Sequence, residues 1–142
     1  MTDSFQLRSS SIAATSVTSM AKQDASKELA LLIAEAADDR KGSDIVILDV
    51  SEVSYLADYF VLITGFSNVQ VRAIARSIED KVEQECQRYP LRTEGQAEGS
   101  WVVQDYGEVI AHIFMPEQRE FYNLEAFWGH ANKTEFSTLV KD

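Results

Sequence analysis

The sequence predicts a single α/β domain in which helices pack against a mixed β-sheet of about four or more strands. The length of 142 residues fits one domain. Short β-branched runs, too compact for helices, alternate with segments whose apolar residues recur every three or four positions. Their order is helix, strand, strand, helix, strand, strand, helix, which places helices against a sheet.

The first helix and the first strand are marked by their ends and their composition. Apolar residues at helical spacing begin near Asp24, and Arg40 with Lys41 precedes Gly42, which is a typical stop signal. The run DIVILDV, residues 44–50, is apolar enough for a strand that is buried on both faces.

The second strand is expected at YFVLIT, residues 59–64, after a polar connection over residues 52–58. The glycine that follows this strand suggests a phosphate-binding turn, but such a turn needs several glycines and usually a lysine. Here Ser67 and Gln70 instead match a capping box, which predicts the start of an amphipathic helix. Its apolar stripe includes Cys86, and Tyr89-Pro90 is expected to end it.

A β-hairpin follows a polar loop at residues 94–100. The apolar runs at residues 101–106 and 109–115 flank Gly107-Glu108, which predicts two antiparallel strands joined by a tight turn.

The last predicted helix opens at Pro116 and ends near Gly129. Phe121 and Leu124 share one helical stripe, so we expect both to face the core. Other side chains lie off the stripe and are of the types that anchor protein interfaces or meet a basic partner: Arg119, Tyr122 and Glu125.

Charge and cysteine content limit the function classes. The formal net charge of −10 argues against broad contact with a nucleic-acid backbone and favours a basic protein partner. Cys86 is the only cysteine, so neither an internal disulfide nor a thiolate zinc cluster can form. No apolar run approaches the ~20 residues that a membrane-spanning helix needs.

Catalytic and metal-binding patterns are not found in the sequence. Asp44 and Asp49 are five residues apart and point to opposite faces of a regular strand, so they do not form the carboxylate pair of metal-assisted nucleotidyl transfer. His112 lies in a strand, where a lone histidine is more often hydrogen-bonded and partly buried than a base. We therefore nominate no catalytic, cofactor-binding or metal-binding residue, and we expect no enzyme activity and no cofactor.

Both ends of the chain are expected to be tails. Residues 1–22 are rich in Ser and Thr, which favours a disordered segment; an organelle transit peptide is the alternative, although Asp3 and the single Arg8 support it poorly. The domain is expected to span residues 23–131, followed by a C-terminal tail at residues 132–142.

Several segments together resemble one known family. The segments LDVSEVSYLADYFVLITGFSN, VRAIA, EG, WVVQDYGEVIAHIF and REFYNLEAFW, in this order and at these distances, are similar to the ribosomal silencing factors, also called Iojap-like proteins. The resemblance covers about residues 24–130. One difference is Gln70, where members often carry histidine.

The resemblance implies a nucleotidyltransferase-like fold without the catalytic carboxylates. It implies binding to the large ribosomal subunit through its ribosomal protein number fourteen, a steric block of subunit joining, and repression of translation. Large-subunit assembly is an alternative function, and a nucleotide-using enzyme is a weaker one. A cytoplasmic location is expected, or an organelle if the N-terminal tail is a transit peptide; neither direct nucleic-acid specificity nor a membrane is expected, and family members also form homodimers.

By motif match, the candidates for partner contact are Asp58, Tyr59, Trp101, Asp105, Tyr106, His112, Arg119, Tyr122, Glu125 and Trp128.

Overall fold

The computed structural model describes residues 21, 22, 24–129 and 131–136, which build a six-stranded mixed β-sheet. The strand order is β3-β4-β5-β2-β1-β6. The β2–β5 pair is parallel and the other neighbouring pairs are antiparallel, which confirms the predicted mixed sheet and hairpin. The strands are β1 (Ser43–Asp49), β2 (Tyr59–Thr64), β3 (Arg92–Glu94), β4 (Trp101–Asp105), β5 (Val109–Phe114) and β6 (Asn132–Glu135).

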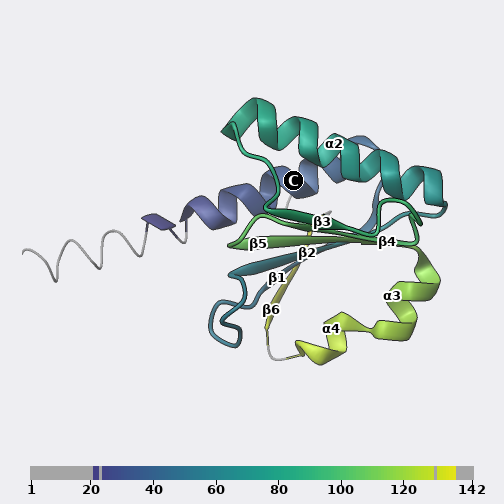
Figure 1. Cartoon of the computed structure of the whole chain (residues 1–142). Helices are drawn as coiled ribbons and strands as arrows, with labels where there is room; N and C mark the ends of the chain where they lie inside the picture. Colours follow the sequence, from purple (N-terminus) through teal and green to yellow (C-terminus); the bar gives the residue numbers. More distant parts are fainter. Residues whose placement is uncertain (1–20, 23, 130, 137–142) are drawn as a thin grey trace, which may run out of the picture.

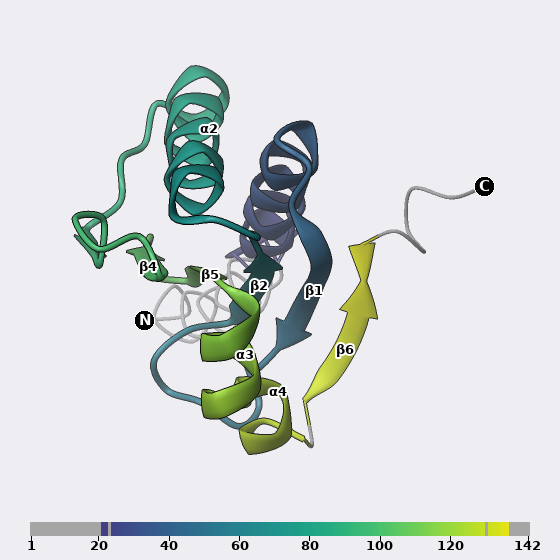
Figure 2. The ribbon, with the colours of Figure 1, turned by 90° about the vertical axis from the view of Figure 1, so that its right-hand side faces the viewer.

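Helices cover both faces of this sheet (Figure 1). An N-terminal helix, residues 24–39, and α2 (Asn68–Cys86) lie side by side on one face. The short helices α3 (Pro116–Tyr122) and α4 (Leu124–Phe127) lie on the opposite face, as the turned view in Figure 2 shows. We call α3 and α4 together the arm.

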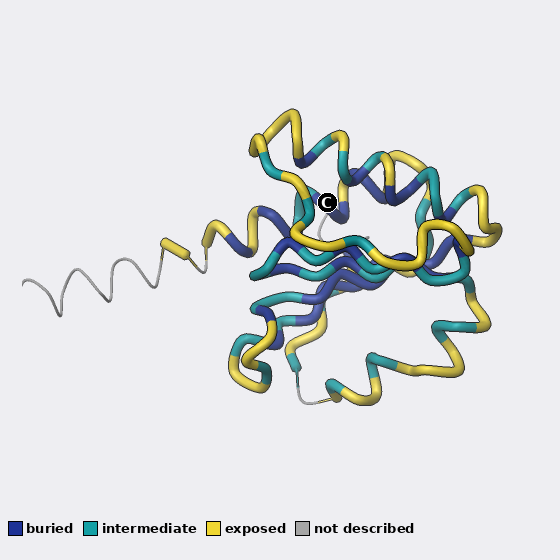
Figure 3. Tube along the Cα trace, in the orientation of Figure 1, coloured by how far each residue is buried: buried dark blue, intermediate teal, exposed yellow. Residues whose placement is uncertain are grey.

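The alternation of side chains along each strand creates two hydrophobic cores. In β1, Ile45 and Ile47 point to the two long helices, whereas Val46 and Leu48 point to the arm. The prediction that this strand is buried on both faces is therefore confirmed. We call the two clusters the helix-side core and the arm-side core; buried residues follow the middle of the sheet between them (Figure 3).

The N-terminal helix ends as predicted, but for a different local reason. Lys41, rather than Gly42, adopts the left-handed conformation, with φ of 61°. A Cβ at Gly42 would lie 2.8 Å from Cγ2 of Ile63 and 3.0 Å from the carbonyl oxygen of Ala37. Glycine is needed here because the helix end approaches β2 closely.

Gln70 links the start of α2 to the end of the N-terminal helix. The Ser67 hydroxyl accepts the Gln70 N–H at 3.0 Å, which confirms the predicted cap. The reciprocal bond differs from a capping box, because Gln70 Oε1 accepts from the N–H of Phe66 at 2.8 Å. Gln70 Nε2 also donates to the carbonyls of Arg40 and Lys41, at 3.3 and 3.1 Å, and so caps the preceding helix end.

Two edge strands differ from the sequence prediction. β3 ends at Glu94, the first residue of the segment that was expected to be a loop. β6 lies where a C-terminal tail was expected, pairs with β1, and is followed by Phe136 in the helix-side core. Their short polar sequences lack the apolar alternation that marks a strand. The tail expected at residues 1–20 and the end of the chain at residues 137–142 lie outside the described residues.

Arg88 connects the end of α2 to the turn between β4 and β5. Its guanidinium donates to both carboxylate oxygens of Glu108, at 2.9 and 2.7 Å, and to the Tyr106 carbonyl at 2.7 Å. In the turn itself, Gly107 has φ of 96°, a conformation that favours glycine. The hydrogen bond from Arg88 holds the pKa of Glu108 below its usual 4.5, despite the opposing effect of burial.

We predict that Gln70→Ala lowers the free energy of unfolding by about 1–2 kcal/mol, because two helix ends lose hydrogen-bond partners. Gln84→Ala is the matched control, since Gln84 is exposed on the same helix, and we expect it to change stability by less than about 0.5 kcal/mol. Urea denaturation of both variants measures the difference; equal values would contradict the bridging role of Gln70.

We also predict that the difference in unfolding free energy between the wild type and Glu108→Gln depends on pH. Because the pKa of Glu108 is lower in the folded chain, its carboxylate stabilises the fold above the unfolded pKa, and this contribution is lost as the pH falls through the folded value. The difference in unfolding free energy should be largest at neutral pH and shrink below pH 4.5. A difference that stays constant from pH 7 to about pH 3 would argue against this ion pair.

Candidate functional site

Aromatic side chains fill the space between the sheet and the arm. The indole of Trp101 on β4 lies 4.7 Å from the ring of Tyr122 on α3, measured between ring centroids. It also lies 5.6 Å from Phe114 and 5.9 Å from His112, both on β5. The fold thus brings together three of the candidate residues, Trp101, His112 and Tyr122, from three elements.

His112 is the polar member of this cluster. Burial lowers the pKa of its imidazole to about 4, so the ring is neutral at pH 7. Its Nδ1 accepts a hydrogen bond from Nε1 of Trp101 at 3.2 Å, and Phe60 packs edge-on at 5.4 Å. A hydrogen-bonded, partly buried histidine is what the sequence predicted.

Trp128 at the end of the arm closes the other side of the cluster. Its indole meets the ring of Phe60 at 5.4 Å and packs against the arm-side core. Leu124 packs there too, as its place in the helical stripe predicted.

Arg119 holds the arm to the sheet. Its Nη1 donates to the Asp44 carbonyl at 2.7 Å and to the Thr64 hydroxyl at 2.8 Å, and its Nε donates to Glu125 at 2.9 Å. Only 12% of its side chain is exposed. The geometry gives Arg119 a structural role instead of the free interface position suggested by the sequence pattern.

Glu125 is the second member of this polar junction. It pairs with Arg119 and lies 3.4 Å from Nζ of Lys133 on β6. Burial alone would raise its pKa, but the hydrogen bonds and charges of Arg119 and Lys133 outweigh burial and lower it. The carboxylate is therefore ionised at neutral pH and links the arm to the edge strand.

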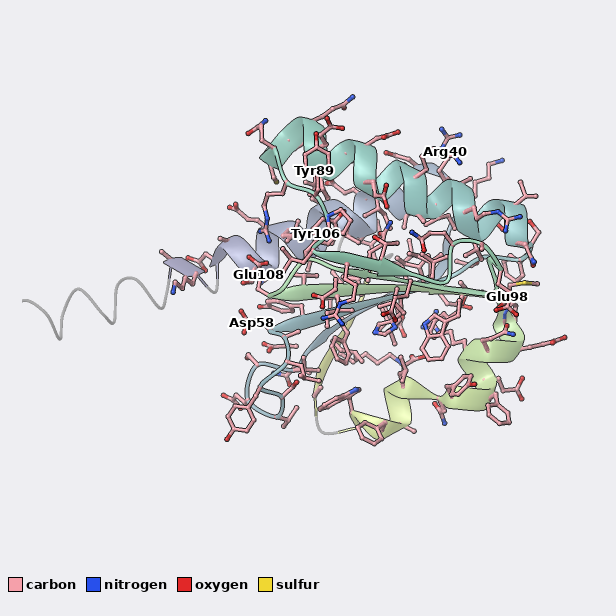
Figure 4. All side chains as sticks on the ribbon, in the orientation of Figure 1. Arg40, Asp58, Tyr89, Glu98, Tyr106 and Glu108 are labelled. Atoms are coloured by element: carbon pink, nitrogen blue, oxygen red, sulfur yellow. The ribbon has the colours of Figure 1, made fainter. Side chains whose placement is uncertain are left out.

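The outer surface of the arm carries aromatic side chains that remain in solvent. Phe121, Tyr122 and Phe127 keep 81%, 53% and 76% of their surface exposed. We call these three residues the aromatic face; Figure 4 shows the side chains that project from α3 and α4. The rings of Phe121 and Tyr122 lie 5.0 Å apart, and adjoining exposed apolar side chains are typical of a contact site for another molecule.

The prediction that Phe121 faces the core is wrong, and the reason is a break in the helix. Asn123 adopts the left-handed conformation, with φ of 45°, and separates α3 from α4. The break rotates the second half of the stripe relative to the first, so Leu124 faces inward while Phe121 faces outward. An Asn between two apolar residues was the signal that could have predicted the break.

The remaining candidates do not join the aromatic cluster. Oδ2 of Asp58 accepts from the Ser26 hydroxyl at 3.0 Å, and Tyr59 packs against the helix-side core. Oδ1 of Asp105 accepts from the Gly107 N–H at 2.8 Å, and Tyr106 is almost fully buried. Figure 4 shows Asp58 and Tyr106 at the end of the sheet opposite to α3.

A second exposed apolar segment was not predicted from the sequence. In the connection between β1 and β2, Val53, Tyr55 and Leu56 are exposed, and Tyr55 is in full contact with solvent. This connection was expected to be simply polar. It lies below the sheet in Figures 1 and 3, as the arm does.

A pocket of about 710 Å³ opens beside the junction of the arm, β1 and β6. Its lining includes the acidic residues Asp38, Asp44 and Glu135, and Arg119 and Glu125 form an ion pair there.

In the described part of the chain, no group of three or more His, Cys, Asp or Glu side chains is placed to hold a metal ion. No described helix is long and apolar enough to cross a membrane.

Comparison with known proteins identifies the family to which this architecture belongs. The family model "Ribosomal silencing factor during starvation" matches residues 23–142. The chain is 40% identical over 105 residues to the ribosomal silencing factor RsfS of Bacillus subtilis, covering 74% of this chain and 88% of that protein. It is 38% identical over 106 residues to the chloroplastic protein Iojap of Zea mays, covering 75% and 46%.

More distant and structural likenesses agree with this result. A protein of Mus musculus named mitochondrial assembly of ribosomal large subunit protein 1 is 30% identical over 87 residues, covering 60% of this chain and 38% of that protein. A crystal structure of a Chromobacterium violaceum protein matches with a TM-score of 0.70 and 38% identity, covering 72% and 85% of the two chains. The resemblance recognised in the sequence motifs is confirmed, and the chain belongs to the ribosomal silencing factor family.

Proposed function

We propose that this protein binds the large ribosomal subunit through its ribosomal protein number fourteen, blocks joining of the small subunit and thereby represses translation. The aromatic face on α3 and α4 is the observation that most supports a protein-binding role. Family membership supports the ribosome as the target.

The aromatic face is suited to binding because it is exposed and yet supported from below. Phe121 buries little in the free protein, so it adds little to folding and is available for a partner. Tyr122 leans on Trp101, and the arm is held by Arg119. Side chains that are already ordered lose less conformational entropy when a partner binds them.

The charge around this face favours a basic protein over RNA. Glu117 and Glu120 are exposed on α3, beside Phe121 and Tyr122. The chain as a whole carries a formal charge of −10. Acidic groups around an apolar centre speed the approach of a basic protein and repel phosphates.

We infer that binding alone accounts for the activity, without turnover or a cofactor. A bound protein that occupies the surface needed by the small subunit excludes it sterically. The turn after β2 supports this inference over nucleotide chemistry, because Ser67 and Gln70 use their polar atoms to cap helices.

Assembly of the large subunit is a second candidate function. The similarity to the mouse protein named for that role supports it. A deletion strain separates the two: immature large subunits at normal joining rates favour assembly, whereas mature subunits that join too readily favour silencing.

Location and oligomeric state follow the same proposal. We propose the cytoplasm, with an organelle as the alternative because the maize relative is named chloroplastic. A homodimer would compete with the ribosome if it used the aromatic face, and sedimentation equilibrium over a range of concentrations tests for it.

We predict that the purified protein sediments with isolated large subunits and not with small subunits, and that it lowers the yield of joined ribosomes. Sucrose-gradient sedimentation with increasing amounts of protein measures both effects. Normal joining at saturating protein would disprove the steric block, even if binding were seen.

We predict that Phe121→Ala speeds dissociation from the large subunit with a loss of ~2 kcal/mol or more if this exposed ring is a hot spot, while thermal stability stays nearly unchanged. Tyr89→Ala is the matched control, because Tyr89 is also an exposed aromatic but lies at the far end of α2 (Figure 4). Association should slow for all variants at high salt, since exposed charges are screened beyond ~8 Å at physiological ionic strength. Equal dissociation rates for the two variants would remove Phe121 from the interface.

A further inference from the structure

Among the described residues, His112 is the one hydrogen-bond partner of the Trp101 indole, which supports the aromatic face. The two residues lie on neighbouring antiparallel strands, where Trp101 pairs with Phe114 and His112 pairs with Val103. They are therefore diagonal neighbours on the arm side of the sheet. Nε1 of Trp101 and Nδ1 of His112 are 3.2 Å apart.

The direction of this hydrogen bond follows from the chemistry of the two rings. An indole N–H can only donate, so Nδ1 of His112 must carry a free lone pair and the proton of the neutral ring must be on Nε2. Burial lowers the pKa of His112 to about 4, so this acceptor is present at neutral pH. A protonated ring would instead direct a second donor at the indole N–H.

The other neighbours of Trp101 cannot define its orientation equally well. The rings of Phe114 and Tyr122 are tilted by 40° and 47° to the indole, and the hydrophobic part of such contacts is not directional. A hydrogen bond is directional and weakens steeply as the donor angle departs from linear. The acceptor on His112 therefore selects the plane of the indole on which Tyr122 rests.

We propose that His112 is a positioning residue for the partner surface: its Nδ1 fixes the indole of Trp101, and Trp101 in turn fixes Tyr122 in the aromatic face. The inference rests on the proposed binding function of that face. His112 acts through Trp101 and does not need to touch the partner, since Phe60, Phe114 and Trp101 surround its ring.

Three substitutions separate the acceptor from the other properties of histidine. In His112→Asn the amide oxygen occupies the place of Nδ1, so it can still accept from Trp101. His112→Gln is the matched control, because its polar atoms reach the place of Nε2 instead. His112→Phe keeps an aromatic ring but has no acceptor.

The isolated full-length protein provides the first measurement. The chain has two tryptophans, and comparison with Trp128→Phe assigns the two indole N–H signals in an NMR spectrum. We expect the Trp101 signal to stay shifted and protected from solvent exchange in the Asn variant, and to lose both properties in the Gln and Phe variants.

Binding to purified large subunits provides the second measurement. We expect dissociation to be about three- to tenfold faster for the Gln and Phe variants, which is the effect of losing a neutral hydrogen bond, and near the wild-type rate for the Asn variant. If the Phe variant fails to fold, the Asn and Gln pair still decides the outcome. Equal rates for Asn and Gln, or unchanged indole signals in Gln, would overturn the positioning role. Failure of the wild type to bind would instead overturn the proposed function, and the role of His112 at a partner surface with it.

Discussion

The attachment of the arm to the sheet depends on one partly buried guanidinium. Arg119 reaches the Asp44 carbonyl and the Thr64 hydroxyl on the first two strands and the Glu125 carboxylate on α4. The pairing of β1 with β2 shifts register between Ser43 and Val46, and Asp44 has φ of 47°, so its carbonyl lies at an irregularity of the strand. Without these acceptors, the charge of a partly buried arginine would be unfavourable, and the arm would lose its orientation.

This attachment makes the two faces of the sheet differ. The two long helices cover one face fully, with buried side chains such as Ile74 and Ile78 facing the strands. The arm has only seven and four residues in its two helices, and neither helix has a buried residue. An arm of this size can cover the sheet only with half-buried aromatic rings, and it leaves Phe121 and Phe127 outside. The short arm therefore creates the exposed aromatic face.

His112 introduces a polar ring among the aromatic side chains on the arm side of the sheet. An apolar residue would avoid the loss of hydration of a buried imidazole, which is reflected in the lowered pKa of His112. The neutral ring offers a directional acceptor in a cluster that otherwise consists of apolar and aromatic contacts. We infer that the hydrogen bond that orients the Trp101 indole is what this buried imidazole provides in return for its loss of hydration.

Much of the fold could be predicted because its signals are local. Strands β1 and β2, helix α2 with its Ser67 cap, and the β4–β5 hairpin each follow from periodicity, caps or turn residues within a few positions. The short strands β3 and β6 could not be predicted, because they are strands only through their pairing with β4 and β1.

The candidate site was predictable in composition but not in geometry. Sequence by itself determined the family, the acidic charge, the α/β class and the presence of aromatic residues near the C-terminal end. Tertiary structure alone decided which side chains near the C-terminal end are exposed and which are engaged within the fold. Arg119 was a plausible contact residue from its sequence position, but the sheet supplies hydrogen-bond acceptors 55 and 75 positions away in the chain. Phe121 was a plausible core residue until the left-handed turn at Asn123 directed it outward. Periodicity describes one helix or strand at a time, whereas exposure depends on contacts between segments that are distant in sequence.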